Sequence, residues 1–273
     1  MKQPSQPNVI FVTGAASGIG AAFAKMAAVK GHQVVVADIN QTQAEAVAQA
    51  IGPRALAVAL DICDPAAWQN ALGAACRHFG RIDVLVNNAG VVFPGRLDEV
   101  PLEQHRKTLD VNVMGPMLGM LAALPLFKAQ GHGHIVTLCS MTAFMTMPGI
   151  VSYAASKSAL RALHLGMALE HRDSGVDFTL MHPGATETPM LEREAERGVS
   201  AAFARQAVPP EEVAKLVLKA LKSKAVEVCI PASRGRFVKA VGMNPARLTE
   251  LVTRNEAIGA ELLAARMAAK TKS

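Results

Sequence analysis

The feature that most constrains how this chain can fold is a regular alternation of short apolar runs with longer helix-like segments. Runs of strand composition span residues 8–13, 33–38, 55–60, 84–87, 134–140, 177–182 and 226–230, and several are almost wholly apolar. Such strands are typical of a parallel sheet that helices cover on both faces. Segments 20–30, 41–51, 65–79 and 152–172 between them have helical composition. The alternation predicts an α/β fold with a doubly wound parallel sheet of about seven strands and right-handed crossovers.

Composition indicates one domain with a basic extension. Hydrophobic residues make up 51% of the 273 residues and charged residues 18%, which permits a sizeable core and argues against a disordered or coiled-coil chain. Because no shift in composition marks an internal boundary, we expect one domain over residues 1–231, with residues 232–273 as a helical extension of it. The extension carries eight of the 28 basic residues against three glutamates, and therefore most of the net charge of +6.

This basic extension raises the question of an anionic partner. Clustered lysine and arginine residues can attract nucleic acid or an anionic membrane surface. Aromatic residues that would stack on bases are not interleaved with these charges. A solvated helix face is therefore the favoured interpretation, and we expect no nucleic-acid partner.

The spacing of cysteine and histidine residues favours neither a disulfide framework nor a metal site. Cys63, Cys76, Cys139 and Cys229 form no CxxC pair, and the eight histidines show no HExxH spacing. We expect reduced thiols, no metal and a cytoplasmic protein, since the N-terminal residues lead into the first strand without an apolar signal core. The uncharged run 111–127 is shorter than the about 20 residues of a membrane span, and we expect a buried helix there and no transmembrane segment.

A glycine-rich stretch, TGAASGIG at residues 13–20, ends the first predicted strand. Glycines permit a tight turn there and let backbone N–H groups approach a pyrophosphate at the N-terminus of the next helix. Taken alone, the stretch is also compatible with a purely structural turn. The residues expected to line a dinucleotide site are Gly14, Ser17, Gly18, Ile19 and Gly20.

Acidic residues end the second and third predicted strands. Asp38 follows Gly14 by 24 residues, about where a Rossmann-like dinucleotide fold places the carboxylate that binds the ribose hydroxyls. This carboxylate would repel the 2′-phosphate of NADP, and no cation follows it, so NAD is favoured over NADP; a solvent-exposed Asp at a turn is the alternative. Asp61, with Ile62 beside it, could contact adenine or cap the helix that begins near Pro65.

The stretch YAASK contains the only tyrosine of the chain. Tyr153 and Lys157 are four residues apart, so they share one face of a helix. A nearby ammonium favours phenolate and lowers the pKa of a tyrosine from about 10. Tyr153 could then exchange a proton with a substrate hydroxyl while a hydride moves to or from a nicotinamide. Ser140, thirteen residues upstream at a strand end, would orient the substrate oxygen.

Taken together, these motifs resemble the short-chain dehydrogenase/reductase family over about residues 9–230. The resemblance rests on TGxxxGIG, NNAG at 87–90, a serine thirteen residues before YxxxK, and the PG after the sixth predicted strand. It implies that Lys157 also holds the nicotinamide ribose and that Asn112 takes part in a proton relay through water. It further implies a mobile substrate lid from about 187 to 207. Further cofactor contacts that the resemblance implies are Asn88, Ala89, Gly90, Pro183, Gly184, Thr186 and Thr188.

Residues that follow these motifs are expected to face the substrate: Val92, Phe93, Met141, Thr142, Met145, Met190 and Leu191. Most are apolar, and several are adaptable methionines. Because no arginine precedes Arg193 in these segments, we expect an uncharged, lipophilic secondary alcohol or ketone; the alternative is that the methionines only fill the core. Cys139, where many relatives have a serine, is a candidate target of thiol reagents.

The leading hypothesis is an NAD-dependent oxidoreductase that interconverts such an alcohol and its ketone. An NADP-dependent carbonyl reductase and a catalytically silent cofactor-binding sensor are the alternatives, although the catalytic set of Asn112, Ser140, Tyr153 and Lys157 is complete. The family also implies self-association through the helices that contain residues 111–127 and 152–172, and hence a homodimer or homotetramer.

Overall fold

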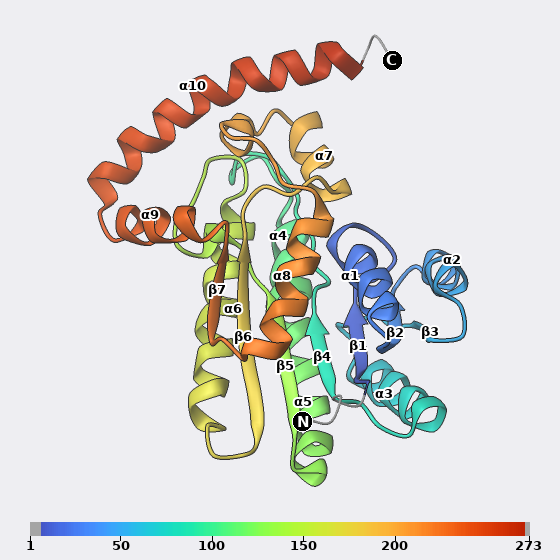
Figure 1. Cartoon of the computed structure of the whole chain (residues 1–273). Coiled ribbons are helices and arrows are strands. Elements are labelled where there is room, and N and C mark those ends of the chain that lie inside the picture. The colour runs from blue at the N-terminus through green and yellow to red at the C-terminus, as the bar shows by residue number, and fades with distance from the viewer. Residues whose placement is uncertain (1–6, 271–273) are drawn as a thin grey trace.

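The strands of the chain form one parallel sheet (Figure 1). The computed structural model describes residues 7–270, and seven strands lie in that part of the chain. Their bounds are β1 Val9–Thr13, β2 Gln33–Asp38, β3 Ala55–Ala59, β4 Val84–Asn87, β5 Gly133–Leu138, β6 Val176–Pro183 and β7 Glu227–Ile230. They stand in the order β3-β2-β1-β4-β5-β6-β7. The doubly wound sheet is confirmed, and each predicted strand ends within two residues of the observed one.

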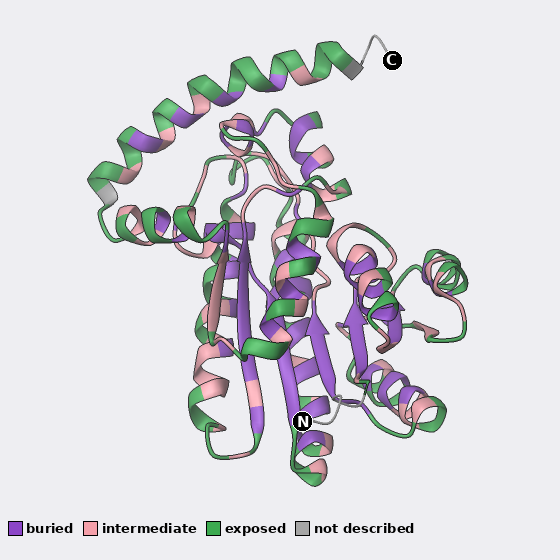
Figure 2. Cartoon of the chain, in the orientation of Figure 1, coloured by how far each residue is buried: buried purple, intermediate pink, exposed green. Residues whose placement is uncertain are grey.

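Helices cover both faces of the sheet, so the core has two layers. One face is covered by α1 Gly18–Val29, α2 Gln41–Ile51 and α8 Pro210–Ser223, and the other by α3 Pro65–Phe79, α5 Gly115–Gln130 and α6 Val151–Glu170. Successive residues of β1 point to opposite layers: Ile10 and Val12 pack in the first, Phe11 in the second. Figure 2 shows the buried strands between helices whose outer surfaces are exposed. Burial on both faces explains why the strands are almost wholly apolar.

Helix α3 begins and ends where the sequence supplies caps. The Asp64 carboxylate accepts a hydrogen bond from the Ala66 N–H at 2.8 Å, and Pro65 occupies the first helical position. Gly80 ends the helix in the left-handed conformation, with a φ of 82°. Asp64 is therefore the N-cap, and the alternative in which Asp61 caps this helix is wrong.

The buried helix predicted for residues 111–127 is part of a longer helical stretch, Leu102–Gln130. Its first part, α4 Leu102–Leu109, passes through one π-helical turn, η1 Asp110–Met114, into α5. Pro116 has no N–H, so the Asn112 carbonyl lacks its α-helical donor, and the wider turn accommodates this. By length and hydropathy the stretch could cross a membrane, but 44% of its apolar window is buried inside the fold. We interpret it as a core helix.

Two segments pack on each other beyond the carboxyl end of the sheet (Figure 1). The lid segment (residues 187–207) contains α7 Pro189–Glu196 and η3 Ser200–Phe203, and the extension contains α9 Ala232–Gly242 and α10 Pro245–Lys270. A Cβ on Gly259 of α10 would lie 1.9 Å from the Ser200 carbonyl oxygen, so the two backbones are in contact. Arg266 pairs with Glu187 at 2.7 Å. The predicted helical extension is confirmed to residue 270, and Lys272 lies outside the described residues.

Candidate active site

A cavity of about 630 Å³ lies at the carboxyl end of the sheet, where the strand order reverses between β1 and β4. Open α/β sheets bind their ligands at such a place. The predicted site residues that the structure brings to its wall are Gly14, Ser17, Gly18, Ile19, Asp38, Asp61, Ile62, Asn88, Ala89, Gly90, Ser140, Met141, Thr142, Met145, Tyr153, Lys157, Pro183, Gly184, Thr186, Thr188, Met190 and Leu191.

Four predicted residues lie elsewhere. Gly20 packs under the glycine loop, and Asn112 is fully buried. Val92 and Phe93 line a separate cavity of about 410 Å³, which corrects their assignment to the substrate pocket. Val92 is buried in a small core with Ile150 and Tyr153. Asn112 fixes the residue before Val92 by binding the Val91 N–H at 2.8 Å and the Val91 carbonyl at 2.9 Å.

The glycine loop after β1 is shaped by contacts that only glycine allows. A Cβ on Gly14, whose φ is 62°, would lie 2.7 Å from the Cα of Ala89, and one on Gly20 would lie 2.3 Å from the Gly14 carbonyl oxygen. The Asn88 amide donates to the carbonyls of Thr13 and Gly14 at 2.8 and 3.0 Å, so it holds the loop in shape. A loop of this kind at the N-terminus of α1 suits a pyrophosphate.

Two carboxylates on the cavity wall are fixed by backbone N–H groups. Asp38, which is half-buried, accepts from Ala16 and from Asn40, each at 3.0 Å. It is therefore held between the glycine loop and the end of β2, which differs from a solvent-exposed turn residue. Asp61 accepts from the Cys63 N–H at 2.9 Å. Both carboxylates are placed to contact a nucleoside in the cavity.

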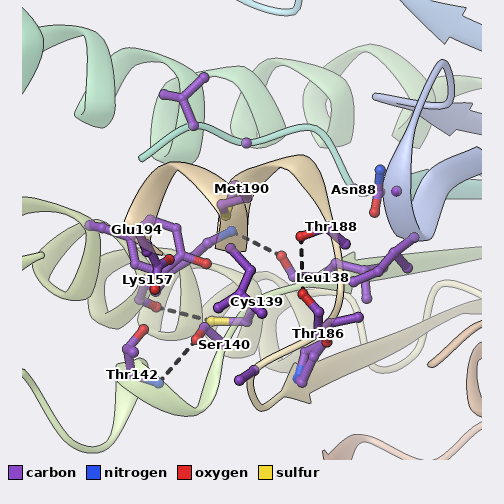
Figure 3. A pocket seen from close by; sticks show the side chains of 18 of the residues that line it. Asn88, Leu138, Cys139, Ser140, Thr142, Lys157, Thr186, Thr188, Met190 and Glu194 are labelled. Carbon is purple, nitrogen blue, oxygen red and sulfur yellow. Dashed lines mark hydrogen bonds between the residues drawn. The ribbon is translucent and has the colours of Figure 1, made fainter. Parts of the chain in front are cut away.

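The start of α6 places a tyrosine and a lysine near the end of β5. Figure 3 labels the lysine, Lys157, together with Leu138 and Ser140. Tyr153 is 9% exposed and Lys157 is 3% exposed. The Lys157 Nζ lies 5.5 Å from the centre of the Tyr153 ring and donates to the Leu138 carbonyl at 3.1 Å. The Ser140 hydroxyl accepts a hydrogen bond from the Thr142 N–H at 3.1 Å. Ser140, Tyr153 and Lys157 thus share one wall, which we call the catalytic wall.

Burial dominates the electrostatics of the catalytic wall. It raises the pKa of Tyr153 well above the ordinary value of 10, the Glu194 carboxylate raises it further, and a hydrogen bond with Ser140 acts in the opposite direction. Burial also lowers the pKa of Lys157. This differs from the prediction that Lys157 lowers the pKa of Tyr153, because burial of the phenolate dominates and Lys157 is not among the groups that shift this pKa. The neutral phenol is the stable form of Tyr153 in this structure.

Cys139 lies in the cavity wall next to Ser140, but its thiol is buried. Its thiol donates to the Lys157 carbonyl at 3.2 Å and is 5% exposed. Burial raises the pKa of this thiol to about 11. Because the thiolate is the reactive form, the structure argues against Cys139 as a target of thiol reagents.

Asn112 supports the catalytic wall from within the core. Besides its two bonds to Val91, its amide donates to the Ser156 hydroxyl at 3.0 Å, and Ser156 in turn donates to the Tyr153 carbonyl at 2.7 Å. Both ends of the Asn112 side chain are therefore engaged. A relay at this residue would use the main-chain carbonyl, which Pro116 leaves without an α-helical donor.

A buried histidine that sequence reasoning missed positions Ser140. The His182 Nδ1 lies 2.8 Å from the Ser140 carbonyl oxygen, and its Nε2 lies 3.0 Å from Glu227. Arg161 donates to the same carboxylate at 2.9 Å. The sequence feature that could have indicated His182 is its position directly before Pro183 and Gly184 at the end of β6.

Charged residues of the cavity were missed as well. Glu194 of α7 is 8% exposed and lines the same cavity. Burial raises the pKa of its carboxyl to about 7. Arg205 and Arg234 also line the cavity. In the sequence these two arginines are marked only by their place in the lid segment and the extension, because it is the packing of those segments over the sheet that brings them to the cavity.

Comparison with known proteins agrees with this geometry. Residues 8–198 match the family described as short chain dehydrogenase. A 2,5-dichloro-2,5-cyclohexadiene-1,4-diol dehydrogenase of Sphingobium indicum is 38% identical over 185 residues, which cover 67% of this chain and 74% of the relative. A 3-alpha-(or 20-beta)-hydroxysteroid dehydrogenase of Mycobacterium bovis is 35% identical over 210 residues, with coverage of 77% and 80%.

A solved short-chain dehydrogenase/reductase from Burkholderia phymatum, in complex with NAD, matches the fold with a TM-score of 0.81. Its sequence is 25% identical, and the match covers 87% of this chain and 94% of that chain. With the glycine loop, the YxxxK pair and the sheet order in place, the chain belongs to the short-chain dehydrogenase/reductase family, whose members are oxidoreductases that act on CH–OH groups.

Proposed function

We propose that this chain is an NAD(H)-dependent oxidoreductase that interconverts a lipophilic secondary alcohol and its ketone. The observation that carries the proposal is a single cavity shared by the glycine loop and by Ser140, Tyr153 and Lys157. The names of a cyclohexadiene-diol dehydrogenase and a hydroxysteroid dehydrogenase among the relatives support a ring-bearing alcohol. A solved relative that contains NAD supports the cofactor class.

On the side of the glycine loop, the residues suit NAD. A nicotinamide nucleotide bound there supplies the carbon that accepts or donates a hydride. Asp38 would accept hydrogen bonds from the ribose hydroxyls and would repel a 2′-phosphate. The adjacent Ile39 is 69% exposed and offers no positive charge to offset that repulsion. Asp61 and Thr188 would contact the adenine and the carboxamide, respectively.

Residues of the catalytic wall would transfer a proton to or from the substrate oxygen. The Ser140 hydroxyl would orient that oxygen, and the Tyr153 phenol would donate a proton to it in reduction or take one in oxidation. Because burial raises the pKa of Tyr153, the phenol is ready as a donor, whereas oxidation needs the positive charge of Lys157 to make the phenolate accessible. Asn112 would carry a water-mediated relay through its main-chain carbonyl.

Turnover and cofactor binding test separate parts of the proposal. A panel of lipophilic secondary alcohols and ketones is assayed with both cofactors by the absorbance of the reduced nicotinamide, and we expect turnover with NAD(H). In fluorescence titrations we expect NADPH to bind at least about tenfold more weakly than NADH, and Asp38→Ala to reduce this difference. Tighter binding of NADPH would favour an NADP-dependent carbonyl reductase. Binding of NADH without turnover of any panel member would favour a cofactor-binding sensor.

We also propose that the protein is cytoplasmic and assembles as a homodimer or homotetramer. Apolar side chains are exposed along the helical stretch Leu102–Gln130 and on α6, among them Leu109 at 45%, Leu121 at 52% and Leu169 at 68%. Pairing of these helices across a two-fold axis would cover such residues. Light scattering should give the mass of two or four chains, and the mass of one chain would refute the assembly.

A further inference from the structure

Three arginines line the cavity, Arg193, Arg205 and Arg234, and the last two repel each other. Arg205 follows η3 in the lid segment, and Arg234 lies in the first turn of α9. Within residues 7–270, neither guanidinium forms an ion pair or a hydrogen bond. Burial lowers the pKa of Arg234, and the like charge of Arg205 lowers it further. The two cations therefore face the same space and repel each other.

The other partly buried arginines of the described residues are paired. The Arg161 Nε lies 2.9 Å from the carboxylate of Glu227, and Arg266 pairs with Glu187 at 2.7 Å. Removing a guanidinium from water without a counterion costs free energy, which an anion that binds in the same place would offset. Arg234 differs from Arg161 and Arg266 because its charged neighbour is another cation, Arg205.

The position of the two arginines separates them from the dinucleotide side of the cavity. Arg234 belongs to the helix that follows β7, the strand at one edge of the sheet, whereas the glycine loop and the end of β2 lie toward the other edge. On the same helix, Val238 packs with Met141 and Met145, which follow Ser140 in the chain. An apolar surface therefore connects the catalytic wall to the arginines.

The buried Glu194 carboxylate of the cavity forms no ion pair with either arginine within the described residues. It raises the pKa of Tyr153, and it is not among the charged groups that shift the pKa of Arg234. The N-terminus of α9 adds to the positive potential, since its N-cap, Pro231, provides no side-chain hydrogen bond to the first backbone N–H groups.

We propose that Arg205 and Arg234 bind an anionic group of the substrate, a carboxylate or a phosphate, held across the apolar surface from the reacting hydroxyl. This inference rests on the proposed alcohol–ketone oxidoreductase function. It replaces the expectation of an uncharged substrate, which considered only the segments before Arg193. A guanidinium binds carboxylate or phosphate oxygens through parallel N–H donors. The substrate class is therefore a hydroxy acid or hydroxyalkyl phosphate with an apolar body.

Substrates that share a ring and a hydroxyl but differ in charge test the proposal. The probes are 4-hydroxycyclohexanecarboxylate, its methyl ester, and (4-hydroxycyclohexyl)methyl phosphate, each assayed for kcat/KM with NAD⁺. We expect at least one anion to exceed the ester by about tenfold or more, and Arg205→Met and Arg234→Met each to remove about tenfold of that preference. The ester should change by no more than about twofold, as the arginines contact only the charged group.

The matched control is Arg236→Met. Arg236 is exposed on the same helix and does not line the cavity, so its replacement should leave all three values unchanged. The larger of the carboxylate and phosphate preferences identifies the anion. Equal kcat/KM for the anions and the ester in the unmodified protein would overturn the site, as would a preference that survives both arginine substitutions.

A binding measurement separates this proposal from the catalytic one. Cyclohexanecarboxylate has no hydroxyl to oxidise, and calorimetry in the presence of NADH should show weaker binding, by about tenfold, to Arg205→Met and Arg234→Met. Arginine-dependent binding without turnover of any probe would support the anion site and refute the oxidoreductase function. Turnover of the ester, together with binding of cyclohexanecarboxylate that neither arginine substitution weakens, would support the oxidoreductase function and refute the anion site. A tenfold loss of NADH affinity in either variant would assign the arginines to the cofactor phosphates and overturn the inference.

Discussion

Replacing Glu194 by glutamine should stabilise the protein at pH values above 4.5, the ordinary pKa of a glutamate, but not below it. Burial raises the pKa of Glu194 from 4.5 to about 7, so the folded state binds a proton more tightly than the unfolded state. Stability is then lost as the pH rises from 4.5 to about 7. At about 1.4 kcal/mol for each pKa unit, the loss in the free energy of unfolding is roughly 3 kcal/mol. Glutamine is neutral at every pH, so the Glu194→Gln variant does not lose this stability.

Thermal unfolding between pH 5 and pH 8 measures this difference. For a chain of this length, roughly 3 kcal/mol corresponds to about 5 °C in Tm. The Tm of Glu194→Gln minus that of the unmodified protein should therefore increase by about 4 °C from pH 5 to pH 8, whatever constant offset the amide itself introduces. Glu196→Gln, on the exposed side of the same helix, is the control and should show no such increase. A Tm difference independent of pH would refute the argument that burial holds Glu194 neutral.

Three further predictions concern single groups of the site and its cover. Tyr153→Phe should abolish turnover while NADH affinity, measured by fluorescence, stays within about threefold, and near-normal turnover would exclude Tyr153 as the acid/base. Gly259→Ala should lower stability by about 1–3 kcal/mol in urea unfolding, since the added Cβ would lie 1.9 Å from a backbone oxygen. Gly166→Ala, with open space around it, should instead raise stability by up to about 1 kcal/mol, and equal effects would contradict the packing. Iodoacetamide at pH 7.5 should leave Cys139 unmodified in the native protein, whereas mass spectrometry showing it labelled as fast as Cys63 would contradict its burial.

The doubly wound parallel sheet could be predicted because burial on both faces requires an apolar run in each strand. The motifs at strand ends could be predicted for a related reason: parallel strands bring their carboxyl ends to one edge, so Gly14, Asp38 and Ser140 meet although they are far apart in the chain. The function of Asp61 was left open between two roles because Asp64, three residues later, has the same capping chemistry. Only the structure assigns the cap to Asp64.

The substrate end of the cavity was beyond such reasoning. Val92 follows the NNAG motif, and proximity in sequence suggested the pocket, but its side chain packs in a small core with Ile150 and Tyr153 and does not line the cavity. Arg234 lies 94 residues from Ser140 in the chain, and only the packing of α9 on the segment after β5 brings it to the cavity. A contact between two segments that are far apart in the sequence produces no local pattern in either segment, so it cannot be predicted from such a pattern.

The lid segment and α10 share one small core, which determines how the cavity can open. Leu263 of α10 is buried together with Leu191 and Phe203 of the lid segment. Each such side chain contributes about 1.5–3 kcal/mol when fully buried, whereas the partly exposed pair of Arg266 with Glu187 contributes about 1 kcal/mol or less. If the lid segment moved alone, it would lose the apolar contacts, and salt would do little to ease that motion because it screens only the ion pair. We therefore expect α10 and the lid segment to move as one body, so that the basic extension acts on substrate entry through its buried apolar face.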